Sequence, residues 1–273
     1  MFKLLPLIAT FILSCPFANA QSAALPMGAR GHALGYTSAC LADEWSIANN
    51  VAGLAKVKNL SAGLSYDLQP SFPAFNKAAF ALCLPGKVGV GVGFVRFGDG
   101  GYQEQILSAG AGSAIGTTCI GLKVNYIRYV VDGMDDKGVI SISIGGMSAL
   151  TPRLTVGAHI VNINQPFLSK ADNERLPTAL IAGLMFKLRE NMFVVTELEK
   201  DLEFSPVWKT GLEYVLDKKF VVRTGFNLYP QAGFFGLGFR LRKFDADYAF
   251  QYTPGWGTRH EASICYDLKL EKK

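Results

Sequence analysis

The stretch Val88-Gly89-Val90-Gly91-Val92-Gly93-Phe94 decides the fold class, because apolar side chains alternate strictly with glycine along it. Period two places the valines and Phe94 on one face of an extended strand and leaves the other face bare. The same alternation of apolar with polar or small residues returns at 60–68, 120–126, 220–228 and 235–241. Most of these runs reach about nine to twelve residues, longer than soluble strands and sufficient for a tilted strand to cross a bilayer.

Fourteen segments of this kind are predicted along the chain. They cover residues 58–68, 74–84, 86–97, 102–113, 117–131, 138–149, 153–163, 177–188, 192–201, 206–216, 219–229, 232–243, 244–252 and 258–269. Very short turns, such as 85–86 and 115–116, alternate with longer connections, such as 132–137 and 165–176. The sequence therefore predicts an all-β fold, an antiparallel transmembrane β-barrel of about 14 strands with short periplasmic turns.

The composition favours lipid as the surroundings of these strands over the interior of a large soluble sheet. Hydrophobic residues make up 49% of the 273 residues, charged residues 18%, and glycine occurs 29 times. Beyond the N-terminal region, no apolar run approaches the roughly 20 residues of a membrane-spanning helix. The net charge of +5 comes from basic residues spread along strands and turns. We therefore expect outer-membrane lipid as a partner, and no nucleic acid.

The N-terminus indicates export. Lys3 precedes an apolar run over 4–13, and Ala18-Asn19-Ala20 matches a signal-peptidase site. An uncleaved anchor is the alternative, but the run is short for a membrane span. Residues 1–20 are thus predicted to be a signal peptide and 58–273 the barrel, located in the cell outer membrane. Residues 21–57 show little strand pattern and are expected to fold into the lumen as a plug.

The sequence contains no recognisable pattern of catalytic, cofactor-binding or metal-binding residues. The three histidines, His32, His159 and His260, have no metal-ligand spacing, and no nucleophile elbow or phosphate-binding glycine loop occurs. We expect no enzyme activity, no cofactor and no metal. After signal cleavage four cysteines remain, Cys40, Cys83, Cys119 and Cys265. An oxidising periplasm permits disulfides, but their places favour single small residues in a wall.

The polar face of the predicted strands carries charges of both signs. The lumen charges expected from the alternation are Lys123, Arg223, Arg240, Arg242, Asp245 and Asp247, together with Asp67, Lys209, Glu213, Glu261 and Asp267. They fit a polar conduit, a bed for the plug, or ion pairs that fill a narrow barrel. The bare face made by Gly89, Gly91 and Gly93 has two interpretations, room for the plug or a kink that opens the wall.

The plug segment resembles the N-terminal signature of the FadL-like outer-membrane superfamily, including the PorV and PorQ proteins of Bacteroidota. The matching positions, which we call the hatch motif, are Gly28, Arg30, Gly35, Asp43, Glu44, Asn50, Ala52 and Gly53. The resemblance implies a fourteen-stranded barrel whose N-terminus forms a hatch in the lumen. Val51 stands where the family usually has proline.

Two functions follow from this resemblance. A PorV/PorQ-type protein is a non-enzymatic component of type IX protein secretion that acts through secretion-system proteins. A FadL-type protein is a passive transporter that moves small hydrophobic molecules past the hatch and through a gap in the wall. The compact chain and its short loops favour the first function, and the second is the alternative.

Overall fold

The computed structural model describes residues 26–169, 174–202 and 205–268. Within them, fourteen strands close into one antiparallel barrel in which each strand pairs with its neighbours in the chain and β1 pairs with β16. The wall strands are β1 Leu60–Leu68, β2 Lys77–Leu84, β3 Val88–Gly98, β4 Tyr102–Ile115, β5 Thr118–Val131, β6 Lys137–Ala149, β7 Leu154–Val161, β10 Ala179–Arg189, β11 Met192–Asp201, β12 Val207–Val215, β13 Phe220–Leu228, β14 Gln231–Arg240, β15 Phe244–Thr253 and β16 Gly257–Leu268. The predicted all-β barrel is confirmed.

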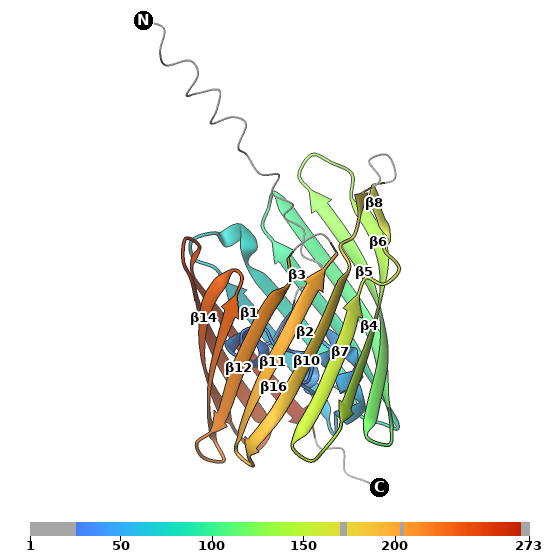
Figure 1. Cartoon of the computed structure of the whole chain (residues 1–273). Helices are drawn as coiled ribbons and strands as arrows, with labels where there is room; N and C mark the ends of the chain where they lie inside the picture. Colours follow the sequence, from blue (N-terminus) through green and yellow to red (C-terminus); the bar gives the residue numbers. More distant parts are fainter. Residues whose placement is uncertain (1–25, 170–173, 203–204, 269–273) are drawn as a thin grey trace, which may run out of the picture.

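The barrel has a short-turn end and a long-loop end (Figure 1). Tight turns such as 116–117 and 190–191 close the lower end in this view. The upper end carries the 3-10 helix η3 (Pro73–Phe75) and a hairpin of β8 (Phe167–Ser169) and β9 (Glu174–Arg175). Short turns at one end and longer loops at the other are the usual arrangement of bacterial outer-membrane barrels.

The outer face of the wall is apolar all the way around. Large side chains that alternate with buried ones point outward, and Leu64, Leu122 and Leu237 are each about half exposed or more, at 63%, 52% and 49%. A soluble monomer rarely exposes a continuous apolar surface of this extent, whereas lipid-facing strands require one. No helix in the described residues is long and apolar enough to cross a bilayer.

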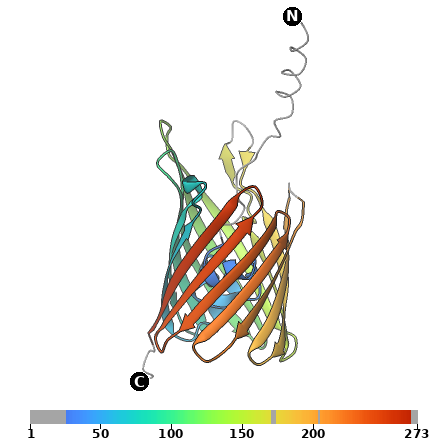
Figure 2. The same cartoon turned by 90° about the vertical axis from the view of Figure 1, so that its left-hand side faces the viewer.

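The N-terminal segment from residue 26 to 57, here called the plug, lies inside the lumen (Figure 2). It contains the helix α2 (Ala29–Ala33) and the 3-10 helices η1 (Glu44–Ile47) and η2 (Val51–Lys56). Its apolar side chains form the largest buried cluster together with inner-face residues of β2, β3 and β16. This cluster comprises Met27, Trp45, Ile47, Val51, Leu54, Ala79, Ala81, Cys83, Val95 and Cys265. The hydrophobic core therefore sits between plug and wall.

Several details differ from the sequence-based expectations. Strand β2 begins at Lys77 rather than 74, because Pro73–Phe75 forms η3. The predicted strand 153–163 ends at Val161, and the loop after it contains the hairpin β8–β9. Arg242 is not a lumen charge: β14 ends at Arg240, and Arg242 lies exposed in the turn before β15. The predicted signal peptide lies outside the described residues.

Candidate functional site

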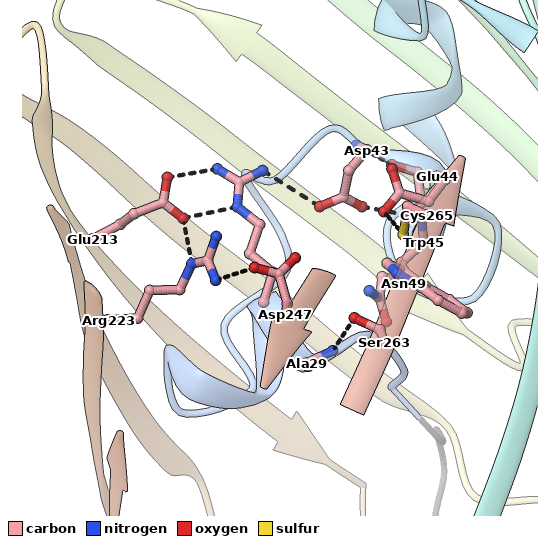
Figure 3. Close-up of polar contacts among 12 residues, drawn as sticks. Ala29, Asp43, Glu44, Trp45, Asn49, Glu213, Arg223, Asp247, Ser263 and Cys265 are labelled. Carbon is pink, nitrogen blue, oxygen red and sulfur yellow. Dashed lines mark hydrogen bonds and ion pairs between the residues drawn. The ribbon is translucent and has the colours of Figure 1, made fainter. Parts of the chain in front are cut away.

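A chain of ion pairs ties the plug to the wall at β12, β13 and β15 (Figure 3). Arg30 of α2 donates from Nε and Nη2 to both carboxylate oxygens of Glu213, at 2.9 and 3.0 Å. Its Nη1 lies 3.5 Å from Asp43 within the plug. The same Glu213 accepts from Arg223 Nε at 2.7 Å, and Arg223 Nη1 donates to Asp247 at 2.5 Å. Two-pronged arginine–carboxylate pairing fixes orientation as well as charge.

A second polar cluster holds the start of the plug against β16. His32 Nδ1 lies 2.9 Å from Glu261 Oε2, and its Nε2 lies 3.0 Å from Gln251. Glu261 Oε1 accepts from the backbone N–H of Gly28 at 2.8 Å and from Ser65 Oγ at 2.6 Å. Glu261 is completely buried, so these partners replace the water that its carboxylate loses.

His32, Glu261 and Asp67 come close enough together to resemble a metal site. The donor set does not fit one, because each acid already has a cationic or hydrogen-bonding partner. Asp67 lies 3.0 Å from Lys77 Nζ and 2.7 Å from Arg259 Nε. The cluster is a buried ion-pair network. The sequence analysis missed it, because these residues lie far apart along the chain and only barrel closure brings them together.

Within the plug, Asp43 and Asn50 of the hatch motif cap the two 3-10 helices. Asp43 Oδ1 accepts from the N–H of Trp45 at 3.1 Å, and Ser46 Oγ accepts from the N–H of Asp43, which completes a capping box. Asn50 Oδ1 accepts from the N–H of Ala52 at 3.1 Å. These caps satisfy backbone donors that the surrounding lumen cannot hydrate.

Two further contacts of the hatch motif reach the wall. Asn50 Nδ2 donates to Gly146 O of β6 at 3.1 Å, as well as to Ala39 O inside the plug at 2.6 Å. Glu44 Oε1 accepts from the thiol of Cys265 at 2.6 Å. Burial and the neighbouring Asp43 raise the pKa of Glu44 to about 7. Glu44 is therefore a plug carboxyl whose charge changes near neutral pH.

The motif glycines are explained by close packing. Gly28 and Gly35 have φ values of 101° and 77°, which favour glycine. At Gly28 and Gly53, an added Cβ would also lie within 2.6 Å of Trp45 or Ser46. These two positions leave no room for a larger residue beside the plug's own side chains.

Glycines of the wall make room for the plug backbone. A Cβ at Gly89 would lie 2.1 Å from Leu54 O, and a Cβ at Gly121 would lie 2.7 Å from the backbone of Val51. Gly91 and Gly93 face the side chains of Leu54 and Ile47. Strand β3 keeps an unbroken register with β2 and β4. The three β3 glycines therefore lie under the plug, in a wall that has no kink there.

The remaining predicted lumen charges lie at different depths. Lys123 is buried and donates from Nζ to the carbonyl groups of plug residues, namely Ile47, Ala48 and Asn49, at 3.0, 2.8 and 3.4 Å. Arg240 reaches Glu213 at 3.8 Å near the short-turn end, and Asp245 lies on the inner face of β15 beside it. Arg223 and Asp247 belong to the ion-pair chain.

Cys40, Cys83, Cys119 and Cys265 are buried free thiols. Cys40 lies in the plug rather than in the wall, and burial raises its pKa to about 12. Cys83 donates to Glu44 O at 3.2 Å. Buried thiols of this kind act as small packing residues.

The long-loop end presents aromatic side chains at the mouth of the lumen. Successive ring contacts join Trp256, Phe72, Phe75, Phe97 and Tyr102, with centroids 5.6 to 6.5 Å apart. We call this set the aromatic rim. Phe72 and Trp256 are 40% and 53% exposed, so part of the rim is open to the outside.

Below the aromatic rim an apolar patch leads inward. Tyr102 packs against the buried cluster of Ile127, Tyr129, Val139 and Leu176. Beneath it lies an inner chamber of about 70 Å³, lined by apolar side chains such as Ile106 and Val161 and by polar ones such as Asn125, Lys123 and His159. Plug residues Pro26, Tyr36, Ser38, Ala48 and Asn49 form its floor. The lumen thus narrows from an aromatic mouth to a chamber closed by the plug.

No protein-family model and no curated protein matches this chain. Solved structures do match it. The Ralstonia pickettii toluene transporter TbuX superposes with a TM-score of 0.65 at 14% identity, covering 90% of this chain and 98% of that one. A mutant of the monoaromatic hydrocarbon channel TodX gives 0.68 at 12% identity, covering 90% and 99%.

A Pseudomonas aeruginosa FadL homologue gives a TM-score of 0.65 at 10% identity, covering 88% of this chain and 98% of that one. Sequence identities this low support a shared fold but not a shared activity. TbuX is a toluene transporter and TodX a monoaromatic hydrocarbon channel, and none of the three similarities links this chain to type IX secretion. The chain has the fold of the FadL-like outer-membrane barrels.

Proposed function

We propose that this protein lies in the outer membrane and lets small hydrophobic molecules cross it passively. The observation that carries the proposal is the aromatic rim, which continues into the apolar patch below it. Exposed aromatic surface at the entrance of a lumen offers a hydrophobic molecule a place to leave water. The fold shared with TbuX and TodX, a toluene transporter and a monoaromatic hydrocarbon channel, supports the same substrate class.

Passage requires the plug to move. The inner chamber of about 70 Å³ is small beside the roughly 300–1,000 Å³ of ordinary ligand sites. Its floor is held by the ion pairs of Arg30 and by the wall glycines. The resting protein is therefore closed, and a ligand enters by displacing plug side chains rather than by diffusing through an open pore.

The test is uptake of radiolabelled toluene by intact Gram-negative cells, whose lipopolysaccharide layer slows hydrocarbons. Cells that make the full-length protein should take up toluene faster than cells carrying an empty vector. Phe97→Gln, which places an amide in the aromatic rim, should lower the protein-dependent rate at least threefold.

Phe97→Leu is the matched control, because it keeps an apolar side chain at the same position. It should retain most of the uptake. Equal rates with and without the protein, at equal outer-membrane abundance, would refute the proposal. Equal uptake rates in the Gln and Leu variants would show that the aromatic rim takes no part in uptake.

A type IX secretion role rests on the resemblance of the hatch motif to PorV and PorQ alone. That motif fits a transporter equally well, since its residues cap the plug and attach it to the wall. Mass spectrometry of proteins that co-purify from outer membranes decides the matter. Stoichiometric secretion components would favour that role over transport.

A further inference from the structure

Basic side chains gather at the short-turn end of the barrel, which is the lower end in Figure 1. Six turns at this end join consecutive wall strands, and five of them carry an exposed lysine or arginine in the turn or at the strand end beside it. The segment that leads into β1 adds one more. These exposed residues, here called the basic ring, are Lys58, Lys87, Arg153, Arg189, Lys218, Lys219, Arg242 and Lys243.

Acidic side chains do not balance the basic ring. Among the described residues of these turns, Glu190 and Asp217 are the exposed acidic ones. No side chain of the basic ring forms an ion pair with another described residue. At the long-loop end, exposed acidic and basic residues are equally numerous in the part of the chain that the structure describes. They are Asp99, Asp132, Asp135, Asp136 and Glu174, and Arg96, Arg128, Lys137, Arg175 and Lys200.

The basic ring lies directly beside the last outward apolar side chains of the wall. Lys87 precedes Val88, and Lys219 precedes Phe220. Val88 and Phe220 point outward and are each 52% exposed. A lysine in such a position can lay its methylene groups along the apolar surface and hold its ammonium group at the level of the lipid headgroups. The basic ring therefore marks the level at which the apolar outer face of the wall ends on this side.

Unpaired cations at the surface of a bilayer attract phospholipids with a net negative charge. An acidic protein is the other partner that this charge would suit, but a protein docks on one side of a surface. The basic ring instead follows the wall from the β2–β3 turn to the β14–β15 turn, around most of the barrel. These two turns, 85–87 and 241–243, contain three residues each. Turns this short keep the cations close to the bilayer and form no protruding surface for a protein.

We propose that the basic ring binds anionic phospholipids, such as phosphatidylglycerol, in the leaflet that surrounds the short-turn end. The lysine and arginine side chains contact the phosphate groups, while the neighbouring apolar side chains contact the acyl chains. The balanced charges of the long-loop end give no such preference, so the two ends of the barrel select different lipids. This inference goes beyond the proposed function, because it requires the barrel to lie in a membrane but not to transport anything.

Two tryptophan reporters, one at each end of the wall, detect the lipids that touch it. Trp208 lies near the start of β12 at the long-loop end and is 52% exposed. It is observed in a chain that carries Trp256→Phe. Phe220→Trp, combined with Trp208→Phe and Trp256→Phe, places an indole at the short-turn end beside Lys219. Trp45 is buried in the plug, so lipid does not reach it.

The full-length protein is reconstituted in vesicles that mix phosphatidylcholine with phosphatidylglycerol, one of the two being brominated on its acyl chains near the headgroup. Bromine quenches indole fluorescence on contact, and both leaflets contain the same lipids. A difference between the reporters therefore comes from the protein. At the Phe220→Trp indole, phosphatidylglycerol should be preferred by about threefold or more at low salt, and at Trp208 neither lipid should be preferred. Salt at about 0.5 M should remove most of the preference by screening.

A triple variant removes three cations from the turn before β13 and from the neighbouring β14–β15 turn. Its substitutions are Lys218→Gln, Lys219→Gln and Lys243→Gln. It should bring the preference at the Phe220→Trp indole close to one. The matched control removes the same charge from the long-loop end and should leave that preference unchanged. Its substitutions are Arg96→Gln, Lys137→Gln and Arg175→Gln.

Three results would overturn the proposal. An equal preference at the two reporters would mean that anionic lipid is drawn to the whole barrel rather than to the basic ring. A preference that survives the triple variant would mean that these lysines do not produce it. No preference at either reporter would show that the basic ring binds no anionic lipid, and would leave an acidic protein as its partner. Toluene uptake is measured separately, so a failure of the proposed function leaves the lipid result standing.

Discussion

The plug is held differently by two sides of the same wall. On β12–β16 it is attached through polar side chains, with Arg30 ion-paired to Glu213 and His32 hydrogen-bonded to Glu261. On β3–β6 the helix η2 lies with its backbone directly on glycines such as Gly89 and Gly121. Charged contacts are strong and directional, whereas close backbone contact depends on shape alone. We expect the plug to stay attached to β12–β16 when the contacts of its η2 side are disturbed.

The largest effect is expected from breaking the charged side. Glu213→Ala leaves Arg30 and Arg223 buried without their shared carboxylate, which costs about 3–5 kcal/mol for a broken buried pair. The plug should leave the lumen intermittently, and planar-bilayer recordings should show conducting events that the unaltered protein lacks. Glu190→Ala, in an exposed turn, is the control. If the Glu213→Ala barrel shows no conducting events and is as heat-stable as the unaltered protein, the charged contacts do not hold the plug.

A smaller effect is expected from crowding the glycine side. Gly89→Ala puts a Cβ 2.1 Å from Leu54 O, and overpacking of this kind costs about 1–3 kcal/mol. Limited proteolysis should cut the η2 region faster than in the unaltered protein, while α2 stays protected. Gly233→Ala is the control, because nothing lies within 4 Å of the added Cβ there. Equal proteolysis of the two variants would mean that the backbone contact does not hold the plug.

Removal of the side chain that caps η2 and bonds it to β6 should have a still smaller effect. Asn50→Ala loses the cap on Ala52 and the bond to Gly146 O, for which about 0.5–2 kcal/mol is usual. Hydrogen exchange should quicken in 50–56 and not in 29–33. Asn191→Ala removes a comparable bond in a turn and serves as the control. Exchange that quickens equally in both plug regions would show a single rigid plug.

The smallest effect is expected from pH, which should change the local stability of the plug around Glu44. The pKa of Glu44 is raised to about 7, so the folded state favours its protonated form. The stability that Glu44 contributes is fully present below about pH 4.5, its ordinary pKa, and is lost as the pH rises through 7. Hydrogen exchange around 43–47, corrected for its intrinsic pH dependence, should be faster at pH 8 than at pH 6. Glu44→Gln should flatten the difference, and Asp217→Asn should not.

The strands could be predicted from the sequence, because period two sorts lipid-facing from lumen-facing residues without any knowledge of partners. Strand ends were less predictable where a local feature overrides the alternation, as η3 does before Lys77 and Asn162 does after β7. Arg242 was assigned to the lumen because its parity matches Arg240, but a turn residue has no fixed face.

The contacts of the plug were also predictable only in part. The hatch motif pointed to Arg30, Asp43 and Asn50, yet their partners Glu213 and Gly146 lie about 100 residues or more away. Closure of the barrel sets such pairs, and a single sequence holds no record of them.

The position of the plug ahead of β1 has a consequence for assembly. The pairing of β1 with β16 closes the barrel. It joins the first strand to the last, and closing a loop that contains the whole barrel is entropically unfavourable. The plug, which is joined to β1 through residues 57–59, binds Glu261, Ser263 and Cys265 of β16 through Gly28, Ala29 and Glu44. Those partners are 221 to 234 residues apart in the chain. In the finished barrel the segment that fills the lumen therefore also links the final strand to the first.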